Sequence, residues 1–205
     1  MDEYLPGWRP PLEAQLIDLA DEIAYNTADL DDAVSAGLLR PEEVAEEAPY
    51  YGELYQAAER QFPGAPESAR FHETLRSLID GLVSGLIEGT VRRAAAAGTA
   101  SVEDVRRHSA RLAGFTPETE TANRDLKRFL HRHVYTAPEL RAERDRAAGM
   151  IAGLFDFFLE HPERLPASHG ELIPEEPAYR VICDYIAGMT DGFFQRTYRQ
   201  MLLAE

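Results

Sequence analysis

Apolar residues recur every three or four positions along most of the chain, which is the spacing of one face of an α-helix. They include Leu12, Leu16, Leu19 and Ile23 near the N-terminus, and Leu75, Leu78, Ile79, Leu82, Val83, Leu86 and Ile87 further along. Alternation with a period of two, the pattern of a half-buried strand, is hard to find between turn residues. The pattern therefore predicts an all-α, multi-helical fold.

Prolines, glycines and capping residues mark where the predicted helices begin and end. These signals are Pro10-Pro11, Gly37, Pro41, the break at 62–66, Gly98, Ser101 with Asp104, Thr116-Pro117 and Ala137-Pro138. The longer predicted helices cover about 11–36, 41–60, 67–97, a segment ending near 135, 139–160 and 178–203. Residues 161–177 contain four prolines and no helical period, which predicts an ordered surface loop. No repeat or linker divides the chain, so residues 1–205 are predicted to form a single helical domain.

Charge changes the picture of what the protein can bind. The chain has 21 basic and 36 acidic side chains, a net charge of −15, and residues 1–48 alone contribute −11 with 13 acidic and 2 basic side chains. This balance gives no strong nucleic-acid signal and argues against attraction to an anionic membrane. With one cysteine, Cys183, the chain has no intramolecular disulfide, and no signal peptide or apolar span is evident. We expect a soluble, cytoplasmic protein.

Carboxylates are concentrated on one face of the first predicted helix. Asp21, Tyr25 and Asp29 follow one another at steps of four, which brings them to the same side of a helix. Such carboxylates repel one another unless a cation, a hydrogen-bond donor or solvent separates them, and their oxygens suit Mg²⁺ or Mn²⁺. Two readings therefore stay open, a metal-binding or substrate-binding face and a solvated acidic face.

Two longer motifs carry a resemblance to a known family. Residues 12–27 (LEAQLIDLADEIAYNT) and 29–32 (DLDD) resemble the segment with the last metal ligand in deoxyguanosine triphosphate triphosphohydrolases, a branch of the HD-domain phosphohydrolases. Residues 184–191 (DYIAGMTD) are similar to the C-terminal signature of that family. Shorter matches, LKRFL at 126–130 and VY at 134–135, fall between them in the expected order. The resemblance covers nearly the whole chain.

The resemblance implies roles for the three residues of the first helix. The family builds one metal site from a His, a His-Asp pair and a final Asp, and Asp21 matches that final Asp. Tyr25 matches a residue near the sugar and phosphates, and Asp29 matches a carboxylate that helps to hold the deoxyribose. The implied reaction is metal-dependent hydrolysis of a deoxynucleoside triphosphate to the deoxynucleoside and triphosphate. The implied metal is a divalent ion, Mg²⁺ or Mn²⁺.

The sequence departs from the family at the other metal ligands. None of its six histidines precedes an Asp, so the His-Asp pair is absent. The chain thus resembles the C-terminal half, with 1–60 as the end of the HD core and 61–205 as the phosphohydrolase-associated region. One Asp cannot hold a catalytic metal, so the chain by itself is expected to be a poor hydrolase unless an HD-bearing N-terminal half is supplied in cis or in trans.

Two functional hypotheses follow. The first is a deoxynucleoside triphosphate triphosphohydrolase represented by its C-terminal half, which we expect to form a homo-oligomer as family members commonly do. The alternative is a non-catalytic helical interaction or regulatory module derived from that family. Under the first hypothesis, the chain should also expose an apolar patch where the missing half would pack.

Other residues have plainer expected roles. Phe71 is expected to pack in the core more readily than to stack on a base. His131 and His133 are two residues apart on a helix and should point in different directions, which makes a shared metal a poor fit. Asp184 and Asp191, seven residues apart, are expected on one side of the last helix, paired with Arg180 and Arg196.

Overall fold

The predicted all-α class is confirmed. A computed structural model describes residues 7–203, apart from the side chain of residue 139, and these residues form helices, turns and loops without any strand. The chain divides into two compact units, Met1–Ala137 and Pro138–Glu205, with the boundary at the predicted break before Pro138. The division predicted at residues 60 and 61 lies inside the first unit, and the single-domain assignment stays a prediction. None of the described helices is both long and apolar enough to span a membrane.

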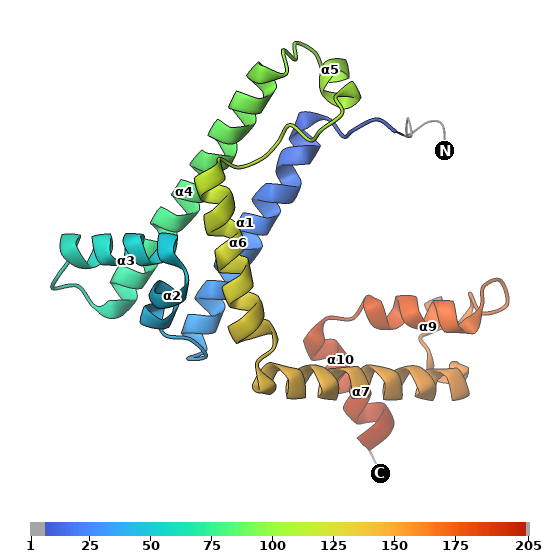
Figure 1. The fold of residues 1–205 in the computed structure, drawn as a ribbon. Coiled ribbons are helices and arrows are strands. Elements are labelled where there is room, and N and C mark those ends of the chain that lie inside the picture. Colours follow the sequence, from blue (N-terminus) through green and yellow to red (C-terminus); the bar gives the residue numbers. More distant parts are fainter. Residues whose placement is uncertain (1–6, 204–205) are drawn as a thin grey trace. The chain divides into compact units, whose positions relative to one another are not determined.

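The first unit is built around its longest helix, α4, against which α1, α3 and α6 pack (Figure 1). Its elements are α1 (Leu12–Ser35), α2 (Pro41–Glu47), α3 (Pro49–Gln61), α4 (Glu67–Ala96), α5 (Val102–Arg107), α6 (Pro117–Leu130) and the π-helix η2 (His131–Tyr135). The side chains of Leu30, Leu78, Leu82 and Leu126 are buried between these helices, as is Phe71, which confirms its expected place in the core.

The single helix predicted over 41–60 is wrong. The structure has two helices, α2 and α3, because Pro49 lacks an N–H and forces the residue before it out of the helical conformation. Ala48 accordingly has φ −116° and ψ 90°. The two predicted caps are correct. Ser101 Oγ accepts from the Asp104 N–H at 3.2 Å while Asp104 Oδ2 accepts from the Ser101 N–H at 2.9 Å, and Thr116 caps α6.

Two glycines on the buried face of α4 allow neighbouring segments to approach very closely. A Cβ at Gly85 would lie 2.1 Å from Thr119 Oγ1, and a Cβ at Gly89 would lie 2.3 Å from the carbonyl oxygen of Gly114. The second clash is with backbone, which cannot rotate away as a side chain can. The segment leading into α6 therefore lies directly on the backbone of α4.

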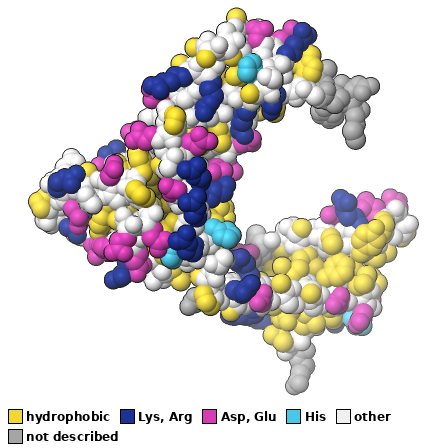
Figure 2. Space-filling model, viewed as in Figure 1, with side chains coloured by type: hydrophobic (Ala, Val, Ile, Leu, Met, Phe, Trp, Pro, Cys, Tyr) yellow, Lys and Arg dark blue, Asp and Glu magenta, His cyan; other side chains and the backbone are white. Residues whose placement is uncertain are grey.

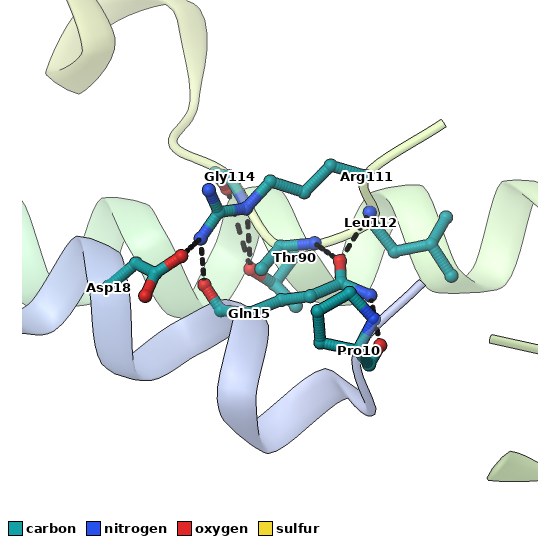
Figure 3. A network of polar contacts seen from close by, with 8 residues as sticks. Pro10, Gln15, Asp18, Thr90, Arg111, Leu112 and Gly114 are labelled. Carbon is teal, nitrogen blue, oxygen red and sulfur yellow. Dashed lines mark hydrogen bonds and ion pairs between the residues drawn. The ribbon is translucent and has the colours of Figure 1, made fainter. Parts of the chain in front are cut away.

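A polar clamp fastens the start of α1 to the same segment (Figure 3). Gln15 is buried, and its Oε1 accepts from the N–H groups of Leu112 at 2.9 Å and Ala113 at 3.3 Å. Its Nε2 donates to the Pro10 carbonyl at 2.8 Å. Arg111 donates to the Gln15 carbonyl and, at 3.1 Å, to Asp18 Oδ2. These bonds fix α1 along its axis, and with it every side chain on its faces.

The second unit packs α7, α9 and α10 around a small core. Its elements are α7 (Pro138–Glu160), the 3₁₀-helix η3 (Pro162–Arg164), α8 (Ala167–Gly170), α9 (Ala178–Ala187), α10 (Asp191–Tyr198) and the π-helix η4 (Arg199–Leu203). Leu154, Phe158, Leu165 and Ile182 form the buried cluster. The segment predicted as a loop over 161–177 contains two single-turn helices, η3 and α8, between its prolines.

The last predicted helix, 178–203, is divided. Thr190 has an extended conformation (φ −75°, ψ 156°) and its Oγ1 accepts from the Phe193 N–H, so it caps a new helix instead of continuing α9. Asp184 and Asp191 therefore lie on different helices, contrary to the prediction. The expected pair between Arg180 and Asp184 is present, with Nε and Oδ2 3.0 Å apart.

Candidate functional site

The three candidate residues lie on α1 on a side that the rest of the first unit covers only in part. Asp21 is exposed, and Tyr25 is 58% exposed. Asp29 is partly buried, one helical turn further on. The neighbouring positions Ile23 and Leu30 point into the core, so the rotation of α1 is set by its apolar face. The candidate face thus looks outward from the described part of the first unit.

A polar seam between α1 and α6 fixes this rotation further. Asn26 Nδ2 donates to Asn123 Oδ1 at 3.3 Å, and both side chains are buried. Asn123 Nδ2 in turn donates to Glu22 Oε1 at 2.8 Å, and Lys127 Nζ lies 3.0 Å from Glu22 Oε2. Because buried amides must keep their hydrogen bonds, α1 has little freedom to rotate against α6. The side chains on its uncovered face are held accordingly.

Tyr135, to which the sequence motifs assign no role, also lies against this face. The hydroxyl of Tyr135, at the end of η2, donates to Asp29 Oδ2, and its ring centroid lies 6.3 Å from that of Tyr25. Burial and the adjacent Asp29 carboxylate raise the pKa of Tyr135 far above its usual range, so the hydroxyl keeps its proton. Tyr135 and Asp29 are 106 positions apart, a separation at which helical periodicity carries no signal.

The π-helix η2 directs neighbouring side chains to different sides. The His131 ring faces Tyr135, with centroids 6.4 Å apart, whereas His133 Nε2 lies 2.9 Å from Glu47 Oε1 of α2. The two histidines therefore diverge, as their spacing predicts. Arg132 also pairs with Glu47, at 2.7 Å. Basic side chains continue along α6, where they form a row in Figure 2.

Among the described residues, the candidate metal ligand Asp21 would fill one position of a metal site. Asp21 offers a hard carboxylate oxygen, and no cation is paired with it among the described residues. Nowhere between residues 7 and 203 do three His, Cys, Asp or Glu side chains gather closely enough to hold a metal ion. A divalent ion at Asp21 would therefore take its other protein ligands from outside these residues.

A cavity in the second unit contains none of the candidate residues. It has a volume of about 790 Å³ and is lined largely by apolar side chains of α7, α9 and α10, among them Met150, Ile151, Phe155 and Phe194. Figure 2 shows hydrophobic side chains gathered over this part of the chain. The cavity has no cluster of ionisable groups that would suit a phosphate.

Comparison with known proteins places these features in a family. Residues 113–200 match the phosphohydrolase-associated domain. The chain is 35% identical over 195 residues to a deoxyguanosinetriphosphate triphosphohydrolase-like protein of Leptospira interrogans, covering 94% of this chain and 51% of that protein. Proteins of the same name are 33% identical over 201 residues in Geobacter sulfurreducens (98% of this chain, 52% of the relative) and 38% over 204 residues in Ralstonia nicotianae (98% and 51%). The chain spans about half the length of the curated relatives it matches. These matches support the family that the sequence motifs indicate, and they support the similarity of this chain to the C-terminal half of the deoxyguanosinetriphosphate triphosphohydrolase-like proteins.

Proposed function

We propose that this chain supplies the C-terminal half of a metal-dependent deoxynucleoside triphosphate triphosphohydrolase. The complete site would form with an HD-bearing N-terminal half, provided in cis or in trans. The observation that carries the proposal is the shared face of α1, on which Asp21, Tyr25 and the bonded pair of Asp29 and Tyr135 lie together. This face lies within the stretch that the family relatives match.

Each side chain on this face has a chemical part in the proposal. Asp21 would hold Mg²⁺ or Mn²⁺ through one carboxylate oxygen, and the chemistry that such an ion would supply is polarisation of the α-phosphate and of the attacking water. Tyr25, which is exposed, offers a ring and a hydroxyl to the sugar and phosphates. Asp29 accepts a hydrogen bond from the deoxyribose. Tyr135 is a positioning residue, because its hydroxyl orients the Asp29 carboxylate.

The wider setting is part of the same proposal. The substrate is a deoxynucleoside triphosphate, and the assembled protein is a cytoplasmic homo-oligomer. The names of the relatives support the family reaction, and their length, about twice the matched region, supports a partner half.

The test is release of triphosphate from a panel of deoxynucleoside triphosphates with Mg²⁺ or Mn²⁺. The chain is assayed by itself and after co-expression with the part of the Ralstonia nicotianae relative that lies outside the matched region. We expect release only from the co-expressed protein, and loss of release with Asp21→Ala. Asp32→Ala is the matched control, because it removes an exposed carboxylate from the same helix and should retain activity.

A negative result has a definite meaning. If the co-expressed halves form a complex that neither binds nor hydrolyses any of the nucleotides, the catalytic proposal is wrong. The alternative from the sequence, a non-catalytic helical interaction or regulatory module, is then the better description. Equal activity of the wild-type protein and Asp21→Ala would likewise remove Asp21 from the metal site.

A further inference from the structure

Helix α4 carries a row of apolar side chains that its own unit leaves exposed. Ile79, Val83, Ile87 and Val91 follow one another at steps of four, and the last two are 57% and 62% exposed. The fully buried face of the helix is a separate row that includes Leu78 and Leu82. A helix on the surface of a domain normally has one apolar face and a polar face opposite it. Here α4 has a second apolar surface.

Ile79 and Val83 of this row line a groove between α4 and α1, and Ile87 and Val91 continue the row along α4 beyond the groove. The groove has a volume of about 390 Å³. Its lining residues are Ala20, Ile23, Ala24, Thr27, Ala28 and Asp31 of α1, with Leu75, Ile79 and Val83 of α4. Three alanines at steps of four keep the α1 wall low, which lets another backbone approach closely. A low wall of small side chains beside a ridge of Ile and Val is the form of surface that receives the apolar face of a helix.

The charges around the groove argue against a second copy of the chain as its occupant. Helix α1 carries seven acidic side chains and no lysine or arginine between Leu12 and Ser35. Two α1 helices brought face to face would place these carboxylates against one another, and like charges across an interface are unfavourable. At one end of the groove, Asp31 Oδ1 is buried and accepts no hydrogen bond from the described residues, and His72 Nε2 lies 3.5 Å from it. The surface therefore suits an apolar helix flanked by hydrogen-bond donors or cations.

The length of the relatives identifies the source of such a helix. The matched proteins are about twice as long as the region that this chain covers, so each contains roughly another chain length of protein. The groove also borders the candidate face, because Asp21 is three residues before Ala24 and is its neighbour on the helix surface. A segment seated in the groove would lie next to Asp21, where the remaining metal ligands are required from outside the chain.

We propose that the α1–α4 groove is the docking surface for an amphipathic helix of the absent N-terminal half. This inference rests on the proposed function for the identity of its partner, but it concerns binding and can be tested without turnover. The occupant presents large apolar side chains to Ala20, Ala24, Ile79 and Val83, with a donor or cation near Asp31.

The experiment measures association of the chain with the same co-expressed part of the Ralstonia nicotianae relative. Complex formation is followed by light scattering after size exclusion, and the dissociation constant by dilution of the complex. Val83→Asp and Ile87→Asp should each weaken binding by at least about thirtyfold, since a charge buried without a partner in an interface is costly. Val102→Asp, at a valine on α5 that is 59% exposed, makes the same kind of change away from the groove and should alter binding less than about twofold.

A labelling experiment guards against variants that merely unfold. In a Cys183→Ser background, Ile87→Cys and Val102→Cys each place one thiol on an exposed position. Maleimide should react with the thiol at position 87 at least about tenfold more slowly in the complex than in the chain by itself, because docking removes that position from solvent. The thiol at position 102 should react at the same rate in both.

Several results would overturn the inference. These are failure of the two parts to associate, association that Val83→Asp and Ile87→Asp leave unchanged, unchanged labelling at position 87, and a homodimer of the chain that these two variants dissociate. Failure of the catalytic proposal looks different. Docking through the groove with no release of triphosphate would refute the reaction and leave the docking surface standing.

Discussion

Replacing Gln15 by alanine should loosen the first unit at one end of α1. The side chain is 3% exposed and satisfies three backbone groups, the N–H groups of Leu112 and Ala113 and the carbonyl of Pro10. In Gln15→Ala these groups lose their partner together. The aliphatic part of the side chain is also lost from a packed position.

The size of the stability loss depends on how readily water can replace the Gln15 amide at each of the three backbone groups. A buried donor or acceptor left without a partner costs about 1–3 kcal/mol. The Leu112 N–H, bonded at 2.9 Å in a buried position, should carry most of this cost, whereas the bond to Pro10 is only partly buried and can be replaced by water. The higher helix propensity of alanine returns a few tenths of a kcal/mol, roughly. We expect a net loss of about 2–4 kcal/mol in the free energy of unfolding of this unit.

Trp8 provides a local probe for the measurement. It is the one tryptophan of the chain and lies against the guanidinium groups of Arg106 and Arg107, 5.3 and 4.7 Å from its ring centroid. Urea unfolding followed by its fluorescence therefore reports on the first unit, and circular dichroism follows both units. Gln56→Ala, at an exposed glutamine of α3, is the matched control and should change stability by less than about 0.5 kcal/mol.

The reasoning fails if Gln15→Ala and Gln56→Ala unfold at the same urea concentration. That outcome would mean that water replaces the amide at no cost, and that the clamp does not hold α1. A change in the slope of the transition without a change in its midpoint would point to the unfolded chain instead.

Three further outcomes are expected. Gly89→Ala should lower the urea midpoint of the first unit, since its Cβ would clash with backbone at a cost of about 1–3 kcal/mol, whereas Gly149→Ala, with open space around it on α7, should raise stability by about 0.5–1 kcal/mol. Burial and the hydrogen bond to the Glu42 carboxylate raise the pKa of Tyr55 to about 12. The contribution of the protonated Tyr55 hydroxyl to stability is therefore complete below about pH 10 and is lost as pH rises towards 12. In Tyr55→Phe, urea unfolding at a series of pH values should show a shallower alkaline loss, and an unchanged loss would contradict the assignment. If the proposed reaction holds, Tyr135→Phe in the co-expressed protein should raise KM for the deoxynucleotide more than it lowers kcat, because Asp29 loses its orienting donor; equal KM values would remove Tyr135 from the site.

Helical periodicity was sufficient for the fold class because most of the chain is amphipathic on a scale of three to four residues. Periodicity does not reveal the break at Pro49, although the proline is visible in the sequence, because the apolar period continues on both sides of it. The division before α10 depends on the Thr190 cap, a short-range hydrogen bond that competes with a continuous pattern.

Part of the candidate site follows from local helical spacing, and part of it depends on tertiary packing. Asp21, Tyr25 and Asp29 share a face through the geometry of a single helix, so their spacing was enough to group them. Tyr135 joins Asp29 through the packing of α6 and η2 on α1, which no short pattern encodes. The sequence predicts an exposed apolar patch but not the groove between α1 and α4, because the position of the groove depends on which faces of the two helices remain uncovered.

The seam between Asn26 and Asn123 has a consequence for how α1 can move. If α1 slid along α6, the two amides would separate within a fraction of a helical turn, and no apolar contact would compensate for their lost bonds. Leucine at both positions would pack well in many registers, and would therefore permit slippage that the amides forbid. The two asparagines therefore fix a single register of α1 against α6, although they stabilise the fold less than a well-packed apolar pair would. If α1 meets a separate half of the protein as we propose, this seam would hold it in a fixed alignment.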